Sequence, residues 1–377
     1  MFDRFVSSLI VALLAPAMIA SAQLRTPAPE TAPPAAAQTT PTVVETGVSE
    51  AETTSPATGT TTPATPADPA APAAVEEEFK AAKPVIVSVR ERTAQLQIFL
   101  DQKLFSPGMI DGKEGRFLVG ALKRWQRANG FPETGVLDAN VPIDSIYPVY
   151  TFHTVDKAEF KFLGQVPGQP SAQSKMKKLL YSNYAEFLAE RYHCSLDFLQ
   201  KLNPALKLNS LAPGTEVRVP NVEPFKIEEM PPTGNFPEDE ALKARRIVID
   251  RKQTILELYE GEKLIASVPI APGSPAHPTP PGKWRILGVA AMPVFRWDKG
   301  VLNHGKRTSN FFMLPPGPNN PVGVGWIGLN KPGIGIHGTN NPYSIGTWAS
   351  HGCMRTANWD IARIAKMVTK GVEVEIL

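Results

Sequence analysis

The stretch that decides the fold lies near the C-terminus. The chain reads Ile336-His337-Gly338-Thr339 and, after a segment rich in Gly, Asn and Pro, Ser350-His351-Gly352-Cys353-Met354-Arg355. A thiol nucleophile needs a proton acceptor and a positive surrounding, which His337, His351 and Arg355 can supply. Glycine also lets backbone N–H groups approach a developing oxyanion. The pattern therefore predicts an activated cysteine rather than a packed one.

The order and spacing of these residues resemble the signature of the L,D-transpeptidase catalytic domain, also called the YkuD-type domain. The resemblance covers about 245–377, since residues 246–250 (Arg-Ile-Val-Ile-Asp) are similar to the first strand of the family. Residues 279–284 (Thr-Pro-Pro-Gly-Lys-Trp) are similar to its Thr-Pro-x-Gly segment. The fold that the resemblance implies is a β-rich domain, a mixed β-sandwich with one main helix.

The resemblance also implies roles for individual residues. Cys353 is the expected nucleophile, His337 the expected general base, and the carbonyl of Gly338 orients that base. The amides around Gly352 and Cys353 are expected to form the oxyanion hole, and Arg355 to hold a substrate carboxylate. The remaining site candidates are His351, which has no defined catalytic role, and the substrate-contact residues Ser350, Tyr343 and Trp348, with Trp326 as a further cleft aromatic. For the aromatic residues, packing in the core or on the surface is the alternative.

The substrate class follows from the same resemblance. It implies attack on a peptidoglycan stem peptide, loss of D-alanine, and transfer of the acyl group to an amine or to water. A tetrapeptide donor with a diamino acid in third place, sensitivity to carbapenems, and neither a metal nor a cofactor are implied as well. A zinc site is the alternative for the two histidines, but zinc sites usually group three or four Cys, His or acidic ligands in a characteristic spacing, and residues 330–360 do not show such a spacing.

The second cysteine, Cys194, raises the question of a disulfide, because an even number of cysteines in an exported chain often forms bridges. It follows Arg191-Tyr192-His193, in what reads as another domain. A bridge to Cys353 would block the proposed nucleophile. We expect Cys194 to be a small buried residue instead.

The N-terminus predicts export. Residues 1–22 carry Arg4, an apolar run and a small-residue ending, as in a cleaved secretory signal, with an uncleaved anchor as the alternative. Residues 23–83 are dominated by Ala, Thr, Pro and Glu, and the first aromatic residue after the signal is Phe79. That composition predicts a disordered tether. The mature protein is expected in the periplasm or cell wall, with no membrane span after signal removal.

Two small modules are predicted between the tether and the catalytic domain. Residues 88–140 resemble the helical peptidoglycan-binding domain in the joint order of Leu96-Gln97, Asp111-Gly112 and Trp125-Gln126, with a generic helical hairpin as the alternative. Residues 150–221 resemble a divergent LysM domain, with strands at both ends and two helices between them. About two dozen residues separate its first strand from its first helix, so glycan binding and a structural spacer are both open. Residues 222–244, with four prolines, are interpreted as a linker.

Within 245–377, alternating apolar residues predict a hairpin of strands at 255–259 and 264–268, and further strands at 246–250, 284–287 and 372–376. One helix is predicted from Ile361, Ile364 and Met367, beginning right after Arg355, so that its N-terminus would favour a thiolate at Cys353.

Charge supports an anionic partner for this part of the chain. It holds 16 Lys and Arg against 8 Asp and Glu, a net charge of +8, whereas the whole chain has a net charge of +3. Peptidoglycan stem peptides, with glycan strands as a further partner, fit a basic domain. The export signal and the lack of a nucleic-acid motif argue against nucleic acid. A hydrolase on the same fold and a non-catalytic wall-binding protein remain the competing functions.

Overall fold

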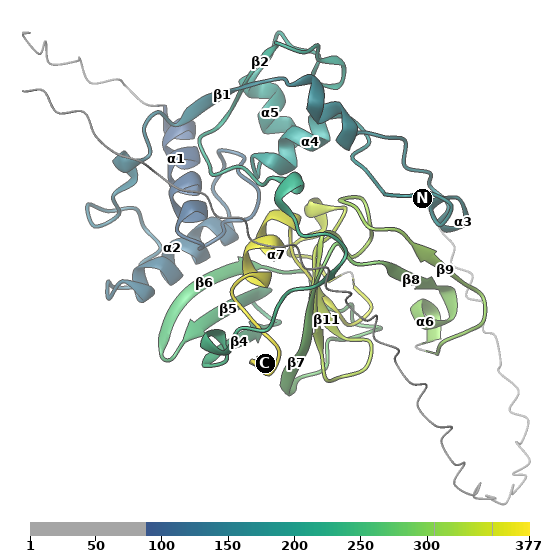
Figure 1. Cartoon of the computed structure of the whole chain (residues 1–377). Coiled ribbons are helices and arrows are strands. Elements are labelled where there is room, and N and C mark those ends of the chain that lie inside the picture. The colour runs from purple at the N-terminus through teal and green to yellow at the C-terminus, as the bar shows by residue number, and fades with distance from the viewer. Residues whose placement is uncertain (1–87, 305, 349) are drawn as a thin grey trace, which may run out of the picture. The chain divides into compact units, whose positions relative to one another are not determined.

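The computed structural model describes residues 88–304, 306–348 and 350–377 (Figure 1). The predicted signal segment (1–22) and tether (23–83) lie outside the described residues. No helix in the described part of the chain is long and apolar enough to cross a membrane.

The first module is a helical pair, as predicted, formed by α1 (Val89–Gln102) and α2 (Arg116–Ala128) and followed by the 3₁₀ turn η1 (Ile143–Ser145). The side chain of Ser88 accepts a hydrogen bond from the Glu91 amide and so caps α1. Phe99 and Trp125 pack edge to face across the pair, with ring centroids 5.3 Å apart. This contact accounts for the apolar stripe seen in both segments.

Two glutamine side chains bind the backbone of the turns in this module. The side-chain oxygen of Gln97 on α1 accepts hydrogen bonds from the amides of Asp111 and Gly112, at 3.1 and 2.8 Å. Gln126 on α2 likewise accepts from the amide of Gly135 at 2.8 Å. Gly112 has φ +67°, a conformation that glycine adopts at little cost. The motif order in the sequence therefore reflects helix side chains that hold two tight turns.

The second module has the predicted strand–helix–helix–strand order. Its elements are β1 (Tyr150–Thr154), η2 (Lys157–Phe162), α3 (Pro170–Gln173), α4 (Tyr184–Arg191), α5 (Leu196–Leu202), η3 (Leu208–Ser210) and β2 (Glu216–Pro220). β1 and β2 pair antiparallel, with Tyr150 opposite Pro220 and Thr154 opposite Glu216. Asn183 and Ser195 cap α4 and α5.

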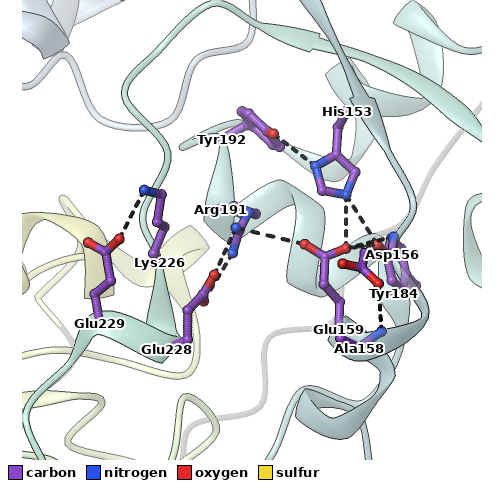
Figure 2. A network of polar contacts seen from close by, with 10 residues as sticks. All are labelled: His153, Asp156, Ala158, Glu159, Tyr184, Arg191, Tyr192, Lys226, Glu228 and Glu229. Atoms are coloured by element: carbon purple, nitrogen blue, oxygen red, sulfur yellow. Dashed lines mark hydrogen bonds and ion pairs between the residues drawn. The ribbon is translucent and has the colours of Figure 1, made fainter.

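The connection between β1 and α4, unusually long in the sequence, is held by a buried polar network (Figure 2). His153 on β1 contacts Glu159 at 3.0 Å through Nε2 and the Tyr192 hydroxyl at 2.9 Å through Nδ1. The Tyr184 hydroxyl donates to Glu159, and Arg191 reaches Glu228 with both terminal nitrogens. Groups from β1, η2 and α4 therefore satisfy one another, which offsets the cost of their burial.

The segment 222–244, interpreted as a linker, contains short elements and packs on the modules on both sides. It contains η4 (Ile227–Glu229), β3 (Gly234–Asn235) and η5 (Glu240–Leu242). The Phe225 amide donates to the Arg191 carbonyl at 2.7 Å, and β3 pairs with β7 (Gly282–Ala291) of the C-terminal module. Phe225 and Ile227 are buried, so apolar burial outweighs the chain-breaking effect of the prolines.

The third module is built on a curled mixed sheet in strand order β12-β11-β10-β7-β13-β4-β5-β6, with β3 added to β7 (Figure 1). The bounds are β4 (Arg245–Asp250), β5 (Ile255–Glu260), β6 (Lys263–Pro269), β7 (Gly282–Ala291), β10 (Gly325–Leu329), β11 (Gly335–His337), β12 (Met354–Arg355) and β13 (Glu373–Ile376). The strands predicted from alternation are confirmed. The predicted β-sandwich is not confirmed, because the strands are hydrogen-bonded continuously through β7 and form one sheet.

A separate hairpin stands off this sheet. Its strands, β8 (Phe295–Asp298) and β9 (Phe311–Leu314), pair antiparallel, and α6 (Lys299–His304) begins its connection. The Asp298 carboxylate accepts hydrogen bonds from the Gly300 amide at 2.9 Å and the Thr308 amide at 2.8 Å. These backbone donors hold its pKa far below the usual range. One buried carboxylate thus closes the tip of the hairpin.

The main helix of this module, α7 (Asn358–Ala365), packs on β10 and β11. Ile361 and Ile364 are buried as predicted. Its bounds differ from the prediction: Ala357 is the N-cap, and the helix ends at Ala365, before Met367. The extended residues around Arg355 pair with β11 first, and this pairing delays the helix.

Candidate active site

The two residues with the strongest predicted roles are brought together by a parallel strand pair. In the β11–β12 register Ile336 is opposite Met354 and His337 is opposite Arg355. Cys353 immediately precedes β12, so the 16 positions that separate it from His337 in sequence are spanned by one loop. Both side chains line a single cleft of about 300 Å³.

His337 is arranged as a proton acceptor. Its ring is buried, and Nδ1 lies 2.6 Å from the Gly338 carbonyl, which can only accept, so Nδ1 carries the proton and Nε2 has the free lone pair. The Trp326 ring stacks on it at 5.3 Å and 15°. Burial lowers the pKa of His337 to about 4. The imidazole is therefore neutral at pH 7, and Gly338 has the geometry expected for orienting it.

Cys353 differs from the expected thiolate. Its half-buried thiol donates to the Gly333 carbonyl at 3.3 Å. Burial raises the pKa of Cys353 to about 11, and a backbone hydrogen bond from Gly335 and the neighbouring charge of Arg355 offset this only in part. The predicted helix effect is absent because α7 starts at Asn358, five residues downstream, and a helix dipole acts mainly within the first turn. The resting thiol is protonated and needs a base during reaction.

Ser350 and Gly352 brace the nucleophile loop. The Ser350 hydroxyl donates to the Cys353 carbonyl and accepts from the Gly352 amide at 3.2 Å. Ser350 is buried and contacts this backbone, and it also lines the cleft, so its substrate contact stays a prediction. Because the Gly352 amide is already engaged, the predicted oxyanion hole depends on the Cys353 amide. Gly352 has φ +104° and sits against the Ile334 side chain, so a larger residue would be strained there.

Arg355 and His351 lie at the same cleft. Within the described part of the chain no carboxylate forms an ion pair with the half-buried Arg355 guanidinium. An unpaired cation suits the predicted carboxylate contact. His351 is exposed at the rim, with its ring centroid 5.1 Å from that of His277. Partial burial and the charges of His277 and Arg355 lower the pKa of His351.

Two predicted aromatic contacts lie outside the cleft lining. Tyr343 is 52% exposed and its hydroxyl accepts from the Leu196 amide at 2.9 Å, while Trp348 is 48% exposed. Trp326 lines the cleft, as considered from the sequence. The cleft residues that the sequence analysis missed come from the β8–β9 hairpin and the turn before β10: Phe295, Arg296, Trp297, Asp298, Val301, Pro321 and Val322. The alternating run 295–298 and the apolar run 311–314 were the available signal.

The cysteine pairing question has a direct answer in the structure. Cys194 and Cys353 are both free thiols, and Cys194 is 3% exposed. Burial raises the pKa of Cys194 well above that of an ordinary thiol. The expectation of a small buried Cys194 is confirmed.

Comparison with known families identifies two of the modules. Residues 244–376 match the L,D-transpeptidase catalytic domain (YkuD), and residues 89–141 match the family described as "Putative peptidoglycan binding domain". The chain therefore contains a YkuD-type L,D-transpeptidase catalytic domain and a peptidoglycan-binding domain. These are the two families that the sequence resemblance named.

Two relatives by sequence agree with this assignment. The chain is 28% identical over 191 residues to the Bacillus licheniformis protein named "Putative L,D-transpeptidase YkuD", covering 51% of this chain and 92% of that one. It is 25% identical over 201 residues to the Escherichia coli K12 protein named "Probable L,D-transpeptidase YbiS", covering 51% and 59%. The structure titled "NMR structure of the catalytic domain from E. faecium L,D- transpeptidase" aligns over 36% of this chain and 98% of that one, at 22% identity and a TM-score of 0.29.

Proposed function

We propose that the protein is an exported L,D-transpeptidase that cross-links peptidoglycan stem peptides through a Cys353 acyl-enzyme. The observation that carries the proposal is the placement, in one cleft, of Cys353 directly before β12 and of a neutral, buried His337 as the last residue of the paired strand β11. The arrangement fits a nucleophile that is neutral at rest and loses its proton to a nearby imidazole during attack.

In the proposed first step the Cys353 sulfur attacks the carbonyl of the third stem residue, and its proton passes to His337 Nε2. The Cys353 amide stabilises the oxyanion. Collapse of the adduct breaks the bond to the terminal D-alanine, whose amine leaves with the proton from His337. The product is a thioester. In the second step an acceptor amine gives a proton to His337, forms the new amide bond and releases the Cys353 thiol.

Charge and domain content support the substrate class. Among the residues that the structure describes, the Arg355 guanidinium in the cleft has no carboxylate partner and is open to a stem carboxylate, and the catalytic domain has a net charge of +8. The peptidoglycan-binding domain would keep the enzyme on its polymer. For residues 150–221 the β1–α4–α5–β2 order supports a LysM-like module, which we propose together with the domain limits 88–140, 150–221 and 245–377. The signal and tether are part of the same proposal.

The product of wild-type enzyme with purified tetrapeptide stems tests the function. Mass spectrometry should find cross-linked dimers and free D-alanine. Tripeptides without dimers would instead identify a hydrolase, and an unchanged tetrapeptide would contradict the proposal. A carbapenem adduct on Cys353 in intact-protein mass spectrometry would separately establish that the thiol is reactive.

The pH dependence of thiol alkylation is a first prediction. Because the pKa of Cys353 is raised to about 11 and that of His337 is lowered to about 4, the free enzyme should hold a neutral pair across the neutral range. The rate of Cys353 alkylation by iodoacetamide should therefore keep rising with pH up to about 11. A plateau reached below pH 7 would reveal a thiolate–imidazolium pair and refute the neutral assignment. Stem-peptide acylation, which uses His337 as the base, should fall only below about pH 4.

A further inference from the structure

Helix α4 of the middle module presents two glutamic acid side chains to the catalytic domain. Glu186 and Glu190 are one turn apart and share a face of the helix. Glu186 Oε1 accepts a hydrogen bond from the Asn319 side-chain amide at 2.7 Å, and Glu190 Oε2 accepts one from the Asn358 amide at 2.9 Å. Helices α4 and α7 are in contact (Figure 1). The two acceptors therefore reach two different parts of the catalytic domain from one short helix.

The contact between Glu186 and Asn319 helps to hold the backbone segment 316–319 in place. The Leu179 amide donates to the Pro316 carbonyl at 3.0 Å, and the Asn319 amide donates to the Leu179 carbonyl at 3.1 Å. The Asn319 side chain also donates to the Leu180 carbonyl at 2.8 Å. A Cβ atom on Gly317 would lie 2.1 Å from the Leu179 oxygen, so these two segments of the chain approach as closely as a glycine allows. Residues 316–319 are thus paired with the end of the long β1–α4 connection.

Residues 316–319 lead directly into the wall of the cleft. Asn320 donates to the Pro315 carbonyl at 2.8 Å and accepts from the Val322 amide at 2.9 Å, which fixes the turn. Pro321 and Val322 line the cleft that holds Cys353. A shift of residues 316–319 would therefore move this wall.

The second contact reaches the general base. Asn358 is fully buried at the first position of α7. Its Oδ1 accepts from the Val324 amide at 3.2 Å, and a Cβ atom on Gly338 would lie 2.3 Å from that same oxygen. The Gly338 carbonyl is the group that binds His337 Nδ1. Asn358 therefore packs against the peptide that orients the imidazole.

We propose that α4 is a structural part of the active site, in which Glu186 and Glu190 are positioning residues. Glu186 holds the cleft wall through Asn319, and Glu190 holds the Gly338 peptide through Asn358. This inference rests on the proposed function for its activity measurements. It assigns the middle module a role in turnover that is independent of any glycan binding.

A charge-compensated pair of substitutions tests the wall contact. Asn319→Asp places a carboxylate against Glu186 and should lower kcat/KM for tetrapeptide stems at least about tenfold. Adding Glu186→Gln restores a donor, because the new amide can donate to the introduced carboxylate while its oxygen keeps the Ser182 amide bond that Glu186 Oε2 makes at 2.8 Å. The double variant should recover most of the loss, but not all, since the bond to Leu180 stays broken. Absence of recovery would overturn the wall role.

The base contact has its own test. Glu190→Ala removes the shorter of the two hydrogen bonds that the Asn358 side-chain amide donates and leaves only the one to the Pro318 carbonyl at 3.2 Å, so it should lower kcat about tenfold with little change in KM. Glu190→Gln should stay close to wild type, because its oxygen can accept from Asn358 and the Tyr181 hydroxyl can turn to accept from its amide. The control is Glu229→Ala, an exposed glutamate of the adjoining segment paired with Lys226, which should change neither parameter. Wild-type kcat in Glu190→Ala would overturn the base role.

Backbone hydrogen exchange separates this inference from the proposed function. Residues 316–324 should exchange faster in Asn319→Asp, and residues 337–339 faster in Glu190→Ala, whether or not the enzyme turns over stem peptides. If Asn319→Asp does not fold, Glu186→Ala, a change at a half-buried surface, provides the same exchange measurement. Unchanged exchange in both segments would overturn the proposal even for a fully active enzyme.

Discussion

Replacing Cys353 with serine should lower the rate of acyl transfer by at least about 10³-fold, because the nucleophile depends on a weak base. His337, with its pKa lowered to about 4, can take a proton from a thiol during attack, but an alcohol is several units less acidic. The initial rate of D-alanine release from tetrapeptide stems measures this loss. Serine is similar in size and the site is only half buried, so the fold should be retained.

Cys194 provides the matched control for that substitution. It is the other free thiol of the chain and lies in the middle module, so Cys194→Ser should keep the D-alanine release rate near that of wild type. Retention of more than about one tenth of the activity in Cys353→Ser would assign the nucleophile elsewhere. Loss of activity in both variants with intact circular dichroism would place Cys194 in an unrecognised role.

The sequence could predict features that depend on local pattern. Alternating apolar residues identified β4, β5 and β6, and the Gly261 turn between β5 and β6 has φ +57° as a tight hairpin requires. The spacing of His337 and Cys353 was informative because both stand beside strands that pair in parallel. A short motif can predict a site when its residues lie on backbone segments that pair with each other.

Features that depend on burial could not be read from the sequence. A low thiol pKa was expected at Cys353 from nearby cations, yet desolvation outweighs the charge of Arg355. Tyr343 is an aromatic residue of the kind expected in a cleft, but its hydroxyl accepts a hydrogen bond from the Leu196 amide of another module. Single-chain periodicity contains no information on such inter-module contacts, and the same reason explains why residues 222–244 were interpreted as a linker.

The largest expected effect on stability comes from Asp101, which joins three modules. This fully buried residue of α1 accepts from Arg363 of α7 through both terminal nitrogens, at 3.1 and 3.0 Å, and contacts His193 Nδ1 at 3.0 Å. Asp101→Ala leaves the Arg363 guanidinium without its carboxylate partner. Removing one partner of a buried pair costs about 3–5 kcal/mol, and we expect a loss of that size in the free energy of unfolding. Urea denaturation followed by tryptophan fluorescence measures it.

A surface aspartate gives the comparison. Asp144 pairs with Arg92 at 3.9 Å with both side chains largely exposed, so Asp144→Ala should leave the urea midpoint almost unchanged. The burial of the Asp101 pair, rather than the number of its contacts, is what makes the two outcomes differ. Equal midpoints for Asp101→Ala and wild type would show that water or Asp360 rearranges to compensate Arg363.

Asp360, beside the same Arg363, should respond to pH in the opposite sense. Burial raises the pKa of Asp360 from 3.8 to about 7, and its Oδ1 has no partner among the described residues. The folded state therefore binds the extra proton between those values, and stability falls as pH rises through that window. Asp101 has its pKa lowered by His193 and Arg363 against the effect of burial, so its contribution is lost only in strong acid. Asp360→Asn should consequently reduce the decline in urea midpoint between pH 4 and about 7, and Asp101→Ala should weaken it as well, because the charge of Asp101 helps to raise the pKa of Asp360. A decline of unchanged size in Asp360→Asn would assign the titration to another buried acid, for which Glu190, with its pKa raised to about 8, is the next candidate.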